Sequence, residues 1–153
     1  MSKGNKKKTV IAQKVEGEKQ TRFGADPNSW LSKQPSWRFS RMDKESERWS
    51  PVDSNNSLLD NILEELSGFE GLTWAEIQQA AGGKKHGTNN HFENISELIS
   101  DAQKRASELH ILEDQMFSLR IGGQRRLYGL LNDGIFSLIW YDKEHEIYPV
   151  SKK

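Results

Sequence analysis

The chain of 153 residues contains no cysteine, so neither a disulfide framework nor a zinc site built on thiolates can form. Hydrophobic residues make up 34% of the chain and the mean hydropathy is -0.82, which is lean for a chain packed entirely into one core. The N-terminus contains lysines but no apolar run as long as those of secretory signals. We therefore expect a cytoplasmic protein with no membrane partner, and with part of its chain outside the core.

Acidic and basic side chains balance to a net charge of zero, but they are unevenly distributed. Residues 1–50 hold twice as many basic as acidic side chains, whereas residues 51–100 are strongly acidic. Residues 1–34 are rich in lysine and polar residues without periodicity, which predicts a disordered basic tail before one domain at 35–153. The tail lysines are either a solvated terminus or an arm that binds nucleic acid without sequence preference.

The domain is predicted to begin with a strand and an amphipathic helix. Within residues 35–43, Trp37 and Phe39 alternate with polar residues at the period of a half-buried strand. From Ser57 onward, leucine and isoleucine recur at helical spacing, and Gly68 is placed to end that helix in a left-handed conformation.

Two further helices are expected before the C-terminal third. Thr73 and Glu76 have the spacing of a capping box at the start of a short helix, and Asn94 is placed to cap a longer one. The first two helices could form a helix-turn-helix DNA reader, but the second carries one charge, which is negative. Between the last two helices, residues 82–94 are predicted to form a loop in which His86 and His91 lack a metal-binding spacing.

The C-terminal third contains the strongest turn signals. The strand-like runs 116–121 and 125–131 are separated by a glycine-containing loop of three residues, which pairs Arg120 with Arg126 across a hairpin. A second hairpin is predicted at Asp133–Gly134. The resulting fold is α+β: an antiparallel sheet, made from the N-terminal strand and a C-terminal meander, with two or three helices packed on one face.

The alternation of side chains along these strands predicts one apolar and one polar sheet face. The apolar face is expected to carry Phe117, Leu119, Ile121, Leu127, Phe136, Leu138 and Trp140. The polar face is expected to carry Ser118, Arg120, Arg126, Tyr128, Ser137 and Tyr141.

The cross-strand pair of Arg120 and Arg126 suggests a function for the polar face. Like charges opposite each other on a sheet are destabilising, so an exposed arginine pair indicates that an anion binds there. The alternatives are that loop carboxylates neutralise the pair, or that the register differs by one residue. Farther along the chain, His145 and Tyr148 are candidate acid or base groups near the same face, or else ordinary surface residues.

This order of elements resembles the RelE/ParE toxin superfamily over about residues 36–150. The resemblance rests on a strand and helices followed by a meander with arginines, a glycine turn, an Asp-Gly turn and a final His/Tyr segment. It implies helices on one sheet face and a basic concave surface on the other. It also implies that Arg120 and Arg126 are the basic site residues, and that His145 and Tyr148 form the catalytic segment.

The resulting hypothesis is a toxin-like endoribonuclease that cleaves mRNA, often on the ribosome, and is neutralised by an antitoxin protein. Cleavage would proceed by attack of the 2'-hydroxyl group on the adjacent phosphodiester, with no metal or other cofactor. Additional contacts to RNA are expected from Arg125, Tyr128, Tyr141 and Lys143, with the tyrosines stacking on bases. Two alternatives stay open: a binding protein of the same fold, either directed at gyrase or an inactive partner, and the helix-turn-helix regulator.

Overall fold

The computed structural model describes residues 26, 28–80 and 90–149. Its contacts divide the chain into two units, 1–30 and 31–153, and the sheet and its helices belong to the second. A short 3-10 helix, η2, spans Ser29–Ser32. The described part of the chain contains no helix with the length and apolarity to cross a membrane.

The second unit begins slightly earlier than the boundary expected at residue 35. The carbonyl oxygen of Lys33 accepts a hydrogen bond from the backbone N–H of Trp74, and the Lys33 ammonium group lies 2.9 Å from the Asp133 carboxylate. Lys33 is therefore part of the folded unit. Most of the predicted disordered tail lies outside the described residues.

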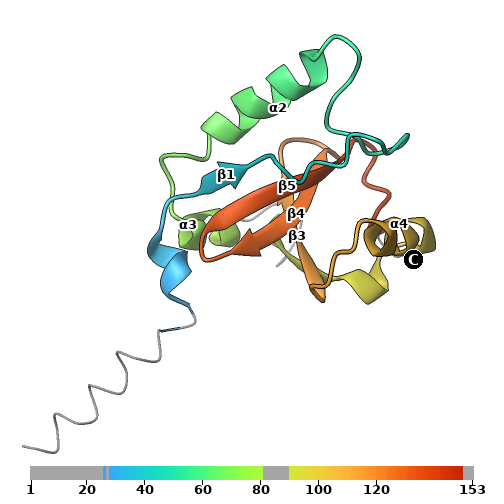
Figure 1. The fold of residues 1–153 in the computed structure, drawn as a ribbon. Coiled ribbons are helices and arrows are strands. Elements are labelled where there is room, and N and C mark those ends of the chain that lie inside the picture. Colours follow the sequence, from blue (N-terminus) through green and yellow to red (C-terminus); the bar gives the residue numbers. More distant parts are fainter. Residues whose placement is uncertain (1–25, 27, 81–89, 150–153) are drawn as a thin grey trace, which may run out of the picture. The chain divides into compact units, whose positions relative to one another are not determined.

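Five strands form one sheet in the order β1-β5-β4-β3-β2 (Figure 1). Their bounds are β1 Ser36–Arg38, β2 His91–Asn94, β3 Gln115–Arg120, β4 Arg126–Asn132 and β5 Ile135–Asp142. The α+β class is thus confirmed, but the sheet is mixed rather than antiparallel, because β1 runs parallel to β5. A parallel neighbour needs a long connection, and nearly the whole domain lies between these two strands.

Both predicted hairpin registers are confirmed. Arg120 faces Arg126 across β3 and β4, and Leu131 faces Phe136 across β4 and β5. At the second turn, Asp133 and Gly134 both have positive φ, at 52° and 85°, as the two central residues of a type I' turn require.

A β-bulge changes the sheet face to which the side chains at the end of β5 point. Gly129 pairs with Leu138 but Tyr128 pairs with Trp140, so Ile139 is an extra residue on β5. Because side chains alternate along a strand, this extra residue reverses the facing of the residues after it. The prediction that Trp140 lies on the same sheet face as Leu138 is therefore wrong. The prediction that Tyr141 lies on the polar face is wrong for the same reason.

Helices cover both sheet faces rather than one. On the first, here the α2/α3 face, lie α2 (Ser57–Ser67) and α3 (Trp74–Gln79), and the Trp74 ring packs 5.5 Å from that of Phe117. The capping box of Thr73 and Glu76 is confirmed. Gly68, however, leaves α2 in a right-handed conformation, with φ of -68°, so the prediction of a left-handed ending is wrong.

The opposite face, here the α4 face, is covered by α4 (Ser100–Glu108), which lies on the other side of the strands from α2 (Figure 1). Its Ala102 and Ala106 belong to the same buried cluster as Tyr128 and Trp140. This helix starts later than predicted, because Asn94 pairs with Gln115 as the last residue of β2 and is followed by the 3-10 helix η3 (Ile95–Glu97). The prediction of a fully open polar face is thus wrong.

Candidate functional site

Arg120 and Arg126 lie at the hairpin end of the α4 face, where both remain half-exposed. Nε of Arg120 and Nη1 of Arg126 each donate a hydrogen bond of 3.0 Å to the carbonyl oxygen of Gly123, which has a φ of 56°. The hairpin loop therefore holds the two guanidinium groups, here the arginine pair, on one acceptor.

The positive charges of Arg120 and Arg126 repel each other. Burial and the charge of Arg120 lower the pKa of Arg126, and the nearby Tyr128 and Asp142 oppose this shift without cancelling it. Among the described residues, no carboxylate forms an ion pair with Arg126 within 4.0 Å. An anion between the two guanidinium groups would relieve their repulsion.

Asp142 holds the segment that follows β5 in position through hydrogen bonds. Its carboxylate is fully buried and accepts hydrogen bonds from the backbone N–H groups of Glu146 and Ile147, at 3.0 and 2.8 Å. The loop between them turns through His145, which has a φ of 57°. Asp142 also faces Arg126 across the sheet, so the residue that holds the histidine loop lies directly opposite one member of the arginine pair.

His145 lies close enough to Arg120 and Arg126 for their charges to act on its imidazole. Burial lowers the pKa of His145, and the positive charges of Arg126 and Arg120 lower it further against the opposing charges of Asp142 and Glu93. Its ordinary pKa is 6.5, so a lowered value leaves the imidazole neutral near pH 7. A neutral imidazole can accept a proton.

Two polar residues of this site were missed, because the loop predicted at 82–94 ends in the edge strand β2. Nδ1 of His91 lies 3.0 Å from Oε2 of Glu93, whose side chain is buried. Positions i and i+2 of a strand share a face, and here they share it with the arginine pair. The alternation of polar His91 and Glu93 about Phe92 was the signal that could have identified the strand.

Tyr148 also lies near this group, partly packed on the core beneath α4. The negative charge of Glu93 raises the pKa of Tyr148, with burial and the charge of Glu97 acting in the same direction. The phenol therefore stays protonated. It is suited to donating a hydrogen bond, and it is unsuited to the role of a base.

Four predicted RNA contacts do not belong to this site. Tyr128 is fully buried and Tyr141 is 7% exposed, so neither ring is available to stack on a base. Arg125 turns to the α2/α3 side, where Nη2 contacts the Glu65 carboxylate at 3.3 Å and the Ile121 carbonyl at 2.7 Å. Lys143 is exposed and lines a hollow near the start of α2 together with Tyr141.

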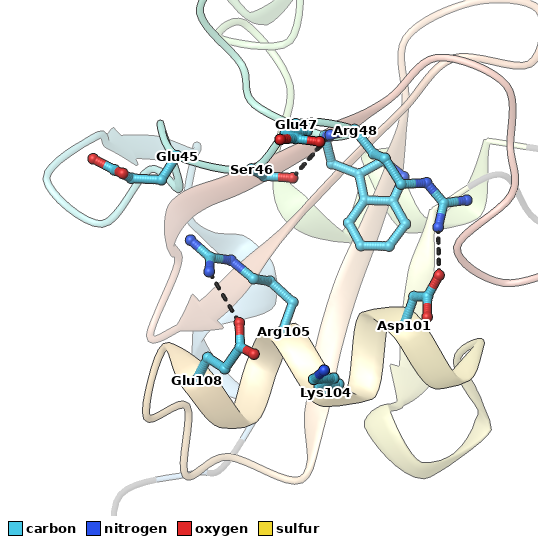
Figure 2. A pocket seen from close by; sticks show the side chains of 9 residues that line it. Glu45, Ser46, Glu47, Arg48, Asp101, Lys104, Arg105 and Glu108 are labelled. Atoms are coloured by element: carbon cyan, nitrogen blue, oxygen red, sulfur yellow. Dashed lines mark hydrogen bonds and ion pairs between the residues drawn. The ribbon is translucent and has the colours of Figure 1, made fainter.

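A second hollow, between residues 45–49 and α4, has a different character (Figure 2). Figure 2 shows Arg48 reaching Asp101 and Arg105 reaching Glu108, at 2.7 and 3.0 Å. Arg105 also makes two hydrogen bonds to Asp43, a buried carboxylate that accepts from the Trp140 indole N–H as well. Since these arginines are all paired, we interpret this hollow as a structural contact between the loop and α4.

Comparisons of the chain with protein-family models, with curated proteins and with solved structures give no match. The function is therefore inferred from the residues of the site itself. Across residues 26, 28–80 and 90–149, no three His, Asp or Glu side chains are grouped as metal ligands.

Proposed function

We propose that this protein is an endoribonuclease that cleaves RNA by attack of a 2'-hydroxyl group on the adjacent phosphodiester. The observation that carries the proposal is the arginine pair, held on the Gly123 carbonyl next to the neutral imidazole of His145. The attack needs a base for the hydroxyl proton and cations for the charge that builds up on the phosphoryl oxygens. These side chains supply both.

Each residue has a distinct role in this reaction. His145 takes the proton from the 2'-hydroxyl group, since its lowered pKa keeps it neutral near pH 7. Arg120 and Arg126 bind the phosphoryl oxygens, as guanidinium groups do through paired N–H donors. Tyr148, protonated beside Glu93, donates a hydrogen bond to the substrate.

The class of RNA is suggested by the resemblance of the meander to the RelE/ParE superfamily. The substrate proposed on that basis is mRNA, including mRNA on the ribosome, and the protein would act as a toxin. An antitoxin protein would then neutralise it by covering the arginine pair. An acidic segment is the chemistry that fits this surface.

The test is to incubate the purified protein with RNA, alone and in a translating extract, and to analyse the ends of the fragments. The proposed reaction yields 2',3'-cyclic phosphate and 5'-hydroxyl ends. Cleavage should persist in excess EDTA, because the base and the cations of the proposed reaction are side chains. An absence of cleavage in both settings would show that this is a binding protein of the same fold and not a nuclease.

The helix-turn-helix alternative is not favoured by the packing of α3. Trp74 and Ile77 of this helix are fully buried, and Trp74 lies among the aromatic rings of the α2/α3 face. No residue of α3 is basic. The helix therefore lacks both the exposure and the charge with which a recognition helix approaches DNA.

A further inference from the structure

The proposed reaction lacks one participant, a group that protonates the departing 5'-oxygen. A strongly basic alkoxide is a poor leaving group, and general acids accelerate such steps by about 100- to 10,000-fold. His145 already serves as the base, and the arginines carry no proton that they can release near neutral pH. The raised pKa of Tyr148 makes its phenol too weak an acid for this step.

His91 occupies the edge of the same sheet face. It pairs with Ser118 of β3, the residue that also faces Tyr128, two positions before Arg120. The side chain of the adjacent Asn90 is fixed as well, since its oxygen accepts a 2.8 Å hydrogen bond from the Arg120 N–H and its amide group donates to the Ile77 carbonyl. The first of these hydrogen bonds joins the start of β2 to the backbone of Arg120, and the second joins it to α3.

The contact with Glu93 orients the imidazole of His91. With Nδ1 directed at the Glu93 carboxylate 3.0 Å away, Nε2 is left as the ring nitrogen for a substrate. The His91 side chain is 42% exposed whereas that of Glu93 is 8% exposed, so the carboxylate lies behind the ring and the ring meets solvent. A buried carboxylate that fixes the tautomer and orientation of a reactive histidine is a recurrent catalytic arrangement.

We propose that His91 is the general acid of the proposed ribonuclease reaction and that Glu93 is the residue that positions it. This inference rests on the proposed function and assigns the second proton transfer of that reaction to a second histidine. The site then contains an imidazole on either side of Arg126, one on β2 and one on the loop after β5.

The proton balance of the reaction is complete with these two residues. His145 removes the 2'-hydroxyl proton while the 2'-oxygen forms a bond to phosphorus. The bond from phosphorus to the 5'-oxygen breaks, and Nε2–H of His91 protonates that oxygen. The products are a 2',3'-cyclic phosphate and a 5'-hydroxyl group, and water returns the proton from His145 to His91 with no net consumption.

The electrostatics favour this division of roles. The hydrogen bond that the Glu93 carboxylate accepts from His91 raises the pKa of His91 against the effect of burial, with the Glu93 charge adding to the rise and Arg126 opposing it. The pKa of His145 is shifted the other way, by burial and by Arg126 and Arg120, against Asp142 and Glu93. Environments that push two titrating groups apart in this way identify which is the acid and which is the base.

The decisive experiment varies the leaving group. We would compare cleavage of a dinucleotide with that of a uridine 3'-phosphate ester of 4-nitrophenol, whose leaving group needs no proton. His91→Ala should slow cleavage of the dinucleotide by about 100-fold or more while changing cleavage of the aryl ester by less than about threefold. His145→Ala is the matched control and should slow both substrates.

The outcomes separate this inference from the proposed function. If the wild-type protein cleaves neither of these substrates and no RNA in a translating extract, the ribonuclease proposal itself fails. If it cleaves only in the extract, His91→Ala must slow that cleavage by about 100-fold or more, and an unchanged rate would show that His91 is not the acid. If it cleaves both, and His91→Ala slows both equally or neither, the ribonuclease survives and His91 is not the acid.

The role of Glu93 is tested by the pH dependence of cleavage, which would not shift if Glu93 were only a structural residue. The acid must be protonated, so dinucleotide cleavage by the wild-type protein should fall above a pKa that is higher than the ordinary 6.5 of histidine. Glu93→Gln keeps an oxygen acceptor but removes the charge, so this alkaline limb should move to lower pH. NMR titration of His91 in the same variant should show the same shift of its pKa to lower pH, and the spectra also report whether the variant is folded. An unchanged His91 pKa in a folded variant would overturn the positioning role of Glu93.

Discussion

Arg125 and Arg126 are neighbours in the chain but lie on opposite sides of the sheet. Arg125 contacts Glu65 of α2, whereas Arg126 shares the Gly123 carbonyl with Arg120. Replacing either arginine by alanine therefore makes the same chemical change in two different surroundings.

Arg126→Ala should abolish most RNA cleavage, with a loss of about 100-fold or more, because a phosphate-binding cation is removed. The same change should leave the free energy of unfolding unchanged or slightly higher, since a like-charge repulsion disappears. Arg125→Ala should behave in the opposite way, with full cleavage and a stability loss below about 1 kcal/mol from the Glu65 contact. Urea denaturation and a fluorescent RNA cleavage assay measure the two effects. Equal activity of both variants would contradict the placement of the site.

Trp140→Ala should be among the most destabilising substitutions in the domain, with a cost of roughly 3–5 kcal/mol. The indole is fully buried on the α4 face, its ring centroid lies 5.2 Å from that of Trp49, and it donates a 2.9 Å hydrogen bond to Asp43. Trp140→Phe keeps a ring but not the donor, so it should retain part of the stability. Thermal and chemical denaturation would decide, and a cost of less than about 1 kcal/mol for the alanine variant would be incompatible with this packing.

Thr73→Ala should lower the free energy of unfolding by about 1 kcal/mol. The Thr73 hydroxyl accepts from the Glu76 N–H at 3.2 Å, and the Glu76 carboxylate accepts from the Thr73 N–H at 2.9 Å. Thr73→Ser keeps the acceptor and is the control, expected to unfold close to the wild-type midpoint. If serine and alanine were equally destabilising, the methyl group and not the cap would be responsible.

The buried pair of Asp43 and Arg105 should make stability depend on pH in the acid range. Burial raises the pKa of Asp43, but hydrogen bonds from Arg105 and Trp140 and the Arg105 charge outweigh it, so the net pKa lies below the ordinary 3.8. A carboxylate with a lowered folded pKa stabilises the protein above its unfolded pKa and loses that contribution as the pH falls through the folded pKa.

We therefore expect Arg105→Ala to be destabilising near neutral pH and to differ less from the wild-type protein below pH 3.8. Denaturation curves of both proteins across the acid range give the comparison. Lys104→Ala serves as the control, because Lys104 is exposed on the same helix. A difference between Arg105→Ala and the wild type that stays constant down to low pH would exclude the ionised pair as its cause.

Features determined by neighbouring residues were predictable from the sequence. The hairpin turns depend on Gly122–Gln124 and on Asp133–Gly134, and they fix the pairing of Arg120 with Arg126 within a few residues of each turn. The capping box at Thr73 is equally local. The arginine pair of the candidate site could thus be predicted from turn chemistry.

Features that depend on distant parts of the chain were not predictable. The bulge at Ile139 and the parallel pairing of β1 with β5 are settled by tertiary packing, and no short pattern marks them. The strand β2 has four residues and forms only by pairing with β3, so His91 and Glu93 looked like members of a loop. The packing of α4 on the sheet face that was predicted to be open likewise depends on the path of the chain after β2.

The bulge at Ile139 makes the candidate site sensitive to residue number as well as residue type. With this extra residue, Asp142 faces Arg126 and directs the His145 loop to the side of the arginine pair. Deleting one residue from β5 would leave the Asp133–Gly134 turn in place, yet Asp142 would point toward α2 and carry His145 away. In evolutionary terms, single-residue insertions and deletions in this strand would be purged more strictly than most substitutions, because they can disassemble the chemistry while preserving the sheet.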